Sequence, residues 1–143
     1  MSESTVLLVD DEAEFVSVLA ERLEARGLIV ETAESGEAAL VKATARAFDA
    51  ILLDMAMPGM DGIETLAGLL EINPDFQVIL LTGRATLTQG VDAMKLGALD
   101  LLEKPADIET VVERIQLAAT RRSSLADKRI AKKMQDILRK KGW

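Results

Sequence analysis

Residues 78–105 read VILLTGRATLTQGVDAMKLGALDLLEKP, and this stretch decides the fold. It begins with four consecutive apolar residues, a pattern typical of a short strand that is buried on both faces. Apolar residues then recur at helical spacing: Val91, Met94 and Ala98. A second strand-length segment occupies residues 99–102. The order strand, helix, strand predicts a β-α-β unit, because two parallel strands need a long crossover between them.

The same alternation extends toward the N-terminus. Residues 6–9 and 50–53 are continuous apolar runs of strand length, and residues 28–32 are a weaker candidate. Helical patterns lie between these runs and after the last one: Phe15, Leu19 and Leu23; Ala39, Leu40 and Ala43; Ile63, Leu66 and Leu70; Ile108, Val111, Val112 and Ile115. Five strands that alternate with helices predict an α/β fold, a doubly wound five-stranded parallel sheet of the flavodoxin-like (βα)5 type.

The C-terminal residues form a separate segment in this pattern. Residues 4–120 hold all the elements described so far and are predicted to form one domain. Ser123 and Ser124 interrupt the pattern, and apolar residues at helical spacing then predict another amphipathic helix ending at Gly142 and Trp143: Leu125, Ile130, Met134, Ile137 and Leu138. Residues 121–143 are therefore expected to be a basic C-terminal helical extension.

The composition excludes several kinds of chemistry. The 143 residues include no Cys and no His, which excludes disulfides, zinc sites, serine triads and imidazole acid–base catalysis. The sequence has no apolar run near the ~18–20 residues that span a bilayer, and its start does not resemble a signal peptide. We expect a cytoplasmic protein without a membrane partner, whose chemistry uses carboxylates, hydroxyls, amines or the backbone.

The net charge of −7 is unevenly distributed. Residues 1–120 hold 22 acidic and 8 basic residues, whereas residues 121–143 hold 2 acidic and 9 basic ones. The acidic part is not a general nucleic-acid binder. The basic extension is open to several interpretations: a solvated continuation of the preceding helix, a contact for a kinase, a dimer contact or a nucleic-acid contact. Direct DNA binding is not expected, because nothing beyond charge is present to read bases.

Polar side chains follow four of the predicted strands. Asp10 and Asp11 follow the first strand, Asp54 the third, Thr82 the fourth and Lys104 the fifth. Taken singly, each residue has a structural explanation as a helix cap, a turn residue or a surface lysine. Ligands of open α/β sheets bind beyond the carboxyl ends of the strands, so we expect these side chains to meet in one site.

Three carboxylates in one crevice repel one another unless a cation lies among them. Carboxylates, a backbone carbonyl and water are the ligands that Mg²⁺ prefers, and such a site leaves positions open for phosphate oxygens. Phosphoryl transfer needs positioning and neutralisation of charge, which Mg²⁺, the amine of Lys104 and the hydroxyl of Thr82 would supply. One of the carboxylates would then accept the phosphoryl group as an acyl phosphate.

This arrangement closely resembles the receiver domain of bacterial two-component response regulators, over about residues 4–120. The motifs that carry the resemblance follow in order: Val9-Asp10-Asp11-Glu12, Leu53-Asp54-Met55-Ala56-Met57-Pro58-Gly59-Met60-Asp61-Gly62, Leu81-Thr82-Gly83, Gly97-Ala98 and Glu103-Lys104-Pro105. Each motif is weak alone, whereas the whole set in this order is a specific signature.

The resemblance implies a role for each matching residue. Asp54 corresponds to the phosphoacceptor, and Asp10 and Asp11 correspond to the acidic pair that holds Mg²⁺. In the family, the phosphoacceptor also binds this ion, and the main-chain carbonyl of Ala56 completes its ligands. The phosphoryl donor is a histidine kinase or a phosphotransfer protein.

The remaining site residues concern the switch. Thr82 corresponds to the hydroxyl that moves to the phosphoryl group, and Lys104 to the lysine that pairs with it. The bond from Lys104 to Pro105 corresponds to a cis peptide of the family. The second switch residue of the family is usually aromatic, but here it is Leu101, which offers less area and no hydroxyl. Coupling between Thr82 and the output surface is therefore expected to be weaker.

The resemblance implies a single-domain regulator that switches partner binding. The output surface would comprise residues 86–96, 99–102 and 107–119, and its partner would be a downstream protein target or a second copy in a homodimer. The chain is expected to assist only its own phosphorylation and dephosphorylation, rather than to be an enzyme. Two alternatives stay open: a phosphohydrolase, which Ala56 disfavours because a second acid usually stands there, and a phosphorylation-independent adaptor or dimerisation module.

Overall fold

The computed structural model describes residues 4–57, 59–83 and 86–140. Five strands and five helices alternate along the chain: β1 (Thr5–Val9), α1 (Ala13–Glu24), β2 (Ile29–Ala33), α2 (Gly36–Ala45), β3 (Ala50–Asp54), α3 (Gly62–Ile72), β4 (Val78–Thr82), α4 (Leu87–Leu96), β5 (Asp100–Glu103) and α5 (Ile108–Lys140). The strands form one parallel sheet in the order β2-β1-β3-β4-β5. The predicted fold class is confirmed.

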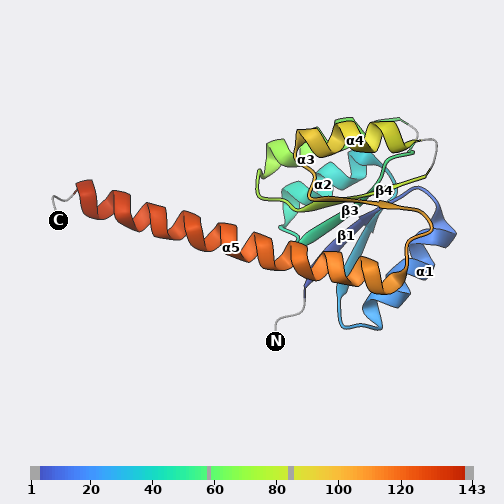
Figure 1. Ribbon diagram of the computed structural model, residues 1–143, viewed down its shortest axis with the longest axis horizontal. Coiled ribbons are helices and arrows are strands. Elements are labelled where there is room, and N and C mark those ends of the chain that lie inside the picture. The colour runs from blue at the N-terminus through green and yellow to red at the C-terminus, as the bar shows by residue number, and fades with distance from the viewer. Residues whose placement is uncertain (1–3, 58, 84–85, 141–143) are drawn as a thin grey trace.

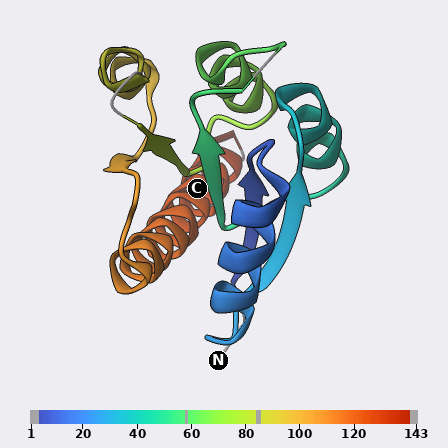
Figure 2. The same ribbon diagram turned by 90° about the vertical axis from the view of Figure 1, so that its right-hand side faces the viewer.

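Helices cover both faces of the sheet, with α2, α3 and α4 on one side and α1 and α5 on the other (Figures 1 and 2). Alternate residues of a strand point to opposite faces. In β3, Ile51 and Leu53 belong to the core beneath α2, α3 and α4, whereas Ala50 and Leu52 belong to the core beneath α1 and α5. The central strands are therefore apolar at successive positions because both of their faces are buried.

The strand order places a crevice at the carboxyl ends of β1 and β3. The chain leaves β1 for β2 on one side, and β3 then pairs with β1 on the other side. This reversal of direction is the place where open α/β sheets bind ligands. Asp10 directly follows β1, and Asp54 is the last residue of β3, so both acids lie at this crevice.

The C-terminal helix differs from the sequence prediction. Helix α5 is continuous through Ser123 and Ser124, so the predicted break is wrong. Serine is only mildly unfavourable within a helix, and ion pairs attach α5 to the domain on both sides of the serines: Arg122–Asp49 at 3.0 Å and Arg129–Asp75 at 2.7 Å.

The last turns of α5 extend away from the domain, as Figure 1 shows. At about 1.5 Å per residue, its 33 residues span about 50 Å. Its apolar side chains beyond the domain are exposed: Ile130, Met134, Ile137 and Leu138. The predicted helix end at Gly142 and Trp143 lies outside the described residues. Among the helices of the described residues, none combines the length and the apolar character needed to cross a membrane.

Candidate functional site

Two buried carboxylates lie at this switch point of the sheet. The relative exposure of Asp10 is 1%, and that of Asp54 is 2%. Both accept hydrogen bonds from nearby main-chain N–H groups: Asp10 Oδ1 from Glu12 at 3.0 Å and Asp54 Oδ1 from Ala56 at 3.4 Å. The two acids come from neighbouring strands, and the parallel register brings their carboxylates together across the strand ends.

Lys104 supplies the positive charge of the site. It follows β5 at the far edge of the sheet, and its side chain reaches back over the strand ends toward β1. Its Nζ lies 3.0 Å from Asp10 Oδ2, 3.3 Å from Asp54 Oδ1 and 3.8 Å from Glu12 Oε1. The peptide bond from Lys104 to Pro105 is cis. One ammonium group thus faces three carboxylates.

The pKa values reflect this imbalance of charge. Burial, followed by repulsion from Asp10, raises the pKa of Asp54, and the opposing effect of Lys104 is smaller. Burial acts to lower the pKa of Lys104, but its hydrogen bond to Asp10 and the attraction of Asp54 and Asp10 raise that pKa overall. The lysine is therefore a firmly held cation, whereas ionised Asp54 is only partly compensated. A further positive charge would stabilise the ionised pair of acids.

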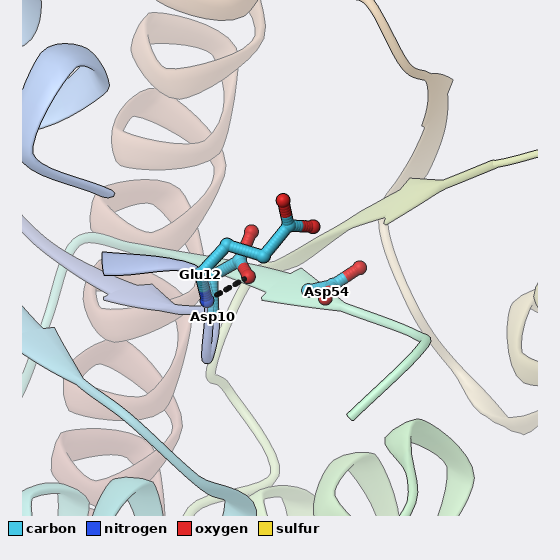
Figure 3. Close-up of side chains that lie close together, drawn as sticks. All are labelled: Asp10, Glu12 and Asp54. Carbon is cyan, nitrogen blue, oxygen red and sulfur yellow. Dashed lines mark hydrogen bonds between the residues drawn. The ribbon is translucent and has the colours of Figure 1, made fainter. Parts of the chain in front are cut away.

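The carboxylates that meet are those of Asp10, Glu12 and Asp54, as Figure 3 shows. One oxygen of each lies within 4.8 Å of the others, which fits a divalent cation that prefers oxygen ligands. Asp11 is exposed and is not part of this group. Metal ligation by Asp11 and by the Ala56 carbonyl stays a prediction.

Glu12 was not identified as a site residue from the sequence, although it belongs to the acidic motif. The chain bends at Asp11, and the Glu12 N–H donates its hydrogen bond back to Asp10 Oδ1 across this bend. The Glu12 carboxylate then lies near those of Asp10 and Asp54. The third acid of the run Asp10-Asp11-Glu12 was the signal in the sequence that could have indicated Glu12.

Thr82 ends β4 beside these acids and is fully buried. Within the part of the chain that the structure describes, its Oγ1 has no hydrogen-bond partner. The Gly83 N–H donates its hydrogen bond to the hydroxyl of Thr86 at 3.1 Å and not to Thr82. Capping of the neighbouring main chain therefore does not explain Thr82. A buried hydroxyl without a partner is costly unless an acceptor enters the site.

Helix α4 approaches both predicted switch residues through Gly90, which sequence reasoning did not identify. A Cβ at position 90 would lie 2.8 Å from Leu101 Cδ1 and 2.9 Å from Thr82 Cγ2. Leu101 is half-buried and packs against the core beneath α4. A glycine in the middle of a helix is normally unfavourable, and this was the signal available in the sequence. Here it lets α4 lie directly against Thr82 and Leu101.

Known proteins are similar to this chain in sequence over most of its length. The profile of the response regulator receiver domain family matches residues 6–116. The transcriptional regulatory protein ZraR of Salmonella typhimurium is 36% identical over 113 residues, which are 79% of this chain and 26% of ZraR. The acid tolerance regulatory protein ActR of Rhizobium meliloti is 36% identical over 110 residues, 77% of this chain and 57% of ActR. The chain thus spans about a quarter to somewhat over half of these relatives.

Solved structures with the same fold include FixJ-N, with a TM-score of 0.78, 34% identity and coverage of 84% of this chain and 96% of that chain. A receiver domain protein from Clostridium thermocellum has a TM-score of 0.82 and 32% identity, covering 85% of this chain and 98% of that one. A structure described as adenylate cyclase from Rhodopirellula baltica has a TM-score of 0.86 and 29% identity, covering 92% and 98%. The region matched by the family profile contains Asp10, Asp54, Thr82 and Lys104.

Proposed function

Because the chain belongs to the receiver domain family of two-component response regulators, we propose that it accepts a phosphoryl group on Asp54 and thereby switches the binding of a partner protein. One observation carries the proposal. A buried pair of acids at the topological switch point shares the ammonium group of Lys104, the one cation that contacts them among the described residues. This geometry supplies a nucleophile and a cation within one crevice, which is what transfer of a phosphoryl group to a carboxylate requires.

The reaction we propose is an in-line displacement at phosphorus. A carboxylate oxygen of Asp54 attacks the phosphorus of a phosphohistidine, the P–N bond breaks, and the imidazole leaves with the bonding electron pair. The product is an acyl phosphate. Since these 143 residues include no His, the phosphohistidine lies outside them, on a histidine kinase or a phosphotransfer protein. Such donors act in the cytoplasm, where we place this chain.

Mg²⁺ fits the carboxylate oxygens of Asp10, Glu12 and Asp54, and when bound it would neutralise charge on the transferring group. The residues of the chain have distinct tasks. Lys104 binds a phosphoryl oxygen as a compact cation, exchanging part of its present contact with Asp54. Thr82 donates its hydroxyl hydrogen to another phosphoryl oxygen, which gives the buried Oγ1 a partner. These tasks describe a phosphoacceptor that assists its own modification, rather than an enzyme that turns over an external substrate.

The output surface in this proposal is the face formed by α4, β5 and the first part of α5. A shift of Thr82 toward the phosphoryl group would withdraw its methyl group from the contact with Gly90. Leu101 shares that contact, so the packing of α4 on β5 would change with it. A downstream protein target, or a second copy of the chain, would sense this change as a shift between two conformations. Direct DNA binding is not part of the proposal.

The proposal is tested with acetyl phosphate as donor. In the presence of Mg²⁺, the wild-type protein should gain the mass of one phosphoryl group, and the added group should be labile in acid and base. Asp54→Asn should gain none, and the wild-type protein in EDTA should gain little. A wild-type protein that takes up no phosphoryl group, or a variant that takes up as much as the wild type, would contradict the proposal.

A further inference from the structure

Lys104 has an aromatic neighbour in addition to its three carboxylates. Its Nζ lies over the ring of Phe15, 4.4 Å from the ring centroid. Phe15 belongs to the first turns of α1 and is half-buried. The face of an aromatic ring is electronegative and attracts an ammonium group at this distance. The ring therefore stabilises the position of a charge that the proposed reaction uses.

A small apolar cavity of about 80 Å³ borders both side chains. Other residues around it come from α1, β4 and α5: Leu19, Leu81, Ile108 and Val111. The lysine side chain has a flexible four-carbon stem, so its ammonium group stays in place only where its neighbours hold it. An aliphatic side chain at position 15 would fill similar space but would offer no negative face.

The contacts of Lys104 respond differently to the proposed reaction. Phosphorylation converts the Asp54 carboxylate into an acyl phosphate, so the negative charge moves from the carboxylate to the phosphoryl oxygens. A cation bound by Asp10 and Glu12 would compete with the lysine for their oxygens. Neither phosphorylation of Asp54 nor binding of a cation removes the contact between Lys104 and Phe15. Among the Lys104 contacts described, the aromatic one can therefore persist throughout the transfer.

We propose that Phe15 is a positioning residue for phosphoryl transfer, whose ring keeps the Lys104 ammonium group at the strand ends where a phosphoryl oxygen arrives. This inference rests on the proposed function of Asp54. The residue acts through Lys104 and does not itself touch the reacting atoms. Cation–π contacts of this kind are modest, so we expect loss of the ring to slow the reaction without abolishing it.

The kinetic test compares Phe15→Leu with Phe15→Tyr, using acetyl phosphate and Mg²⁺ and following the intact mass over time. The rate constant of Phe15→Leu should fall about threefold to tenfold, and Phe15→Tyr should stay within about twofold of the wild type. Phe15→Met is a second aliphatic replacement in case Phe15→Leu folds poorly. Val18→Ala alters another side chain that lines the same cavity and should leave the rate unchanged.

A spectroscopic test needs neither metal nor phosphoryl group. The ε-methylene protons of Lys104 should show an upfield ring-current shift in the wild type, Phe15→Tyr and Val18→Ala, and lose it in Phe15→Leu. Wild-type rates in both aliphatic variants, or an equal loss of rate in Val18→Ala, would overturn the inference. If the wild-type protein takes up no phosphoryl group, the proposed function fails instead, and the ring-current shift still reports whether Phe15 covers the lysine.

Discussion

At the scale of single residues, the site is defined by its charge balance. Asp54 is buried beside a second acid, and Lys104 compensates for only part of their charge. The pKa of Asp54 consequently lies above its ordinary value of 3.8. Such a perturbed carboxylate, located in a crevice, is typical of a functional group, because stability alone would favour a neutral side chain there.

The first prediction is that Asp54→Asn stabilises the protein in EDTA. Because folding raises the pKa of Asp54, its contribution to stability is complete below pH 3.8 and is lost as the pH rises through the folded-state value. The advantage of the variant in Tm should therefore grow as the pH rises through the folded-state pKa of Asp54 and level off above it. A few degrees are expected, since about 1 kcal/mol shifts Tm by about 2–8 °C.

Thermal unfolding from pH 4 to pH 8 checks this prediction. Glu71→Gln neutralises an exposed carboxylate and is the matched control, in which no such trend is expected. Mg²⁺ should narrow the difference between the wild type and Asp54→Asn, because a bound cation stabilises the ionised acids. A difference in Tm that decreases as the pH rises would contradict the interpretation of the site.

The residues of the site were predictable from the sequence to different degrees. Asp10, Asp54, Thr82 and Lys104 stand at the ends of apolar runs, so strand periodicity alone brings them to one edge of the sheet. Glu12, Phe15 and Gly90 depend on the turn after β1 and on how closely α1 and α4 approach the strands. Apolar patterns do not specify such distances, so these three residues were missed.

At the scale of elements, the contact of α4 with β4 and β5 depends on the missing side chain at position 90. Space for a Cβ is lacking there, because Leu101 and Thr82 both lie within 3 Å of its ideal position. The contact joins the two residues that we expect to switch. A helix held this closely will respond to small displacements of either side chain, since packed interiors do not deform gradually.

The second prediction concerns Gly90→Ala. Alanine favours helix by about 1 kcal/mol over glycine, but overpacking typically costs about 1–3 kcal/mol, so we expect a net loss of stability. Removing the Leu101 side chain relieves the contact at 2.8 Å and leaves the one with Thr82 at 2.9 Å. The same substitution should therefore cost less, or stabilise, in a Leu101→Ala background.

Urea unfolding of the four proteins in this double-mutant cycle gives the coupling free energy. Gln89→Ala changes an exposed neighbour on the same helix and should be nearly neutral. A coupling energy near zero between positions 90 and 101 would show that α4 does not rest on Leu101 in solution.

At the scale of the whole molecule, α5 connects the domain to a long basic extension. Asp49 connects α5 to the start of β1. Its Oδ2 accepts a hydrogen bond from the Thr5 N–H at 2.9 Å, and its Oδ1 accepts one from Arg122 at 3.0 Å. Arg129 and Asp75 form a second ion pair, about two turns farther along the helix. The extension thus begins as a fixed part of the domain and ends in solvent (Figure 1).

The third prediction is that Asp49→Ala destabilises the domain by about 1–2 kcal/mol, because a half-buried main-chain donor loses its acceptor. Arg122→Ala should cost less than about 1 kcal/mol, since it removes one partly exposed ion pair. Both variants should raise the hydrogen-exchange rates of residues 121–140. Unchanged exchange in both would mean that these contacts do not hold the extension.

The overall fold was predictable because three buried central strands, β1, β3 and β4, appear in the sequence as continuous apolar runs that alternate with helical patterns. The length of α5 stayed open at the sequence level, because the serine pair resembled a break although a continuation of the preceding helix was one of the interpretations. The way α5 is attached to the domain was not predicted: Arg122 and Arg129 pair with Asp49 and Asp75, acids that lie 73 and 54 residues away in the chain. Pairings this distant are not visible in a local pattern.

In the proposed function, Asp54 is the residue that receives the phosphoryl group. The most direct measurement treats the protein with acetyl phosphate and Mg²⁺, reduces the acyl phosphate with borohydride, and locates the reduced residue by peptide mass spectrometry. We predict reduction at position 54 alone, dependent on Mg²⁺ and absent in EDTA. Modification at Asp10, Asp11 or Glu12 with Asp54 intact, or labelling that ignores the metal, would contradict the account.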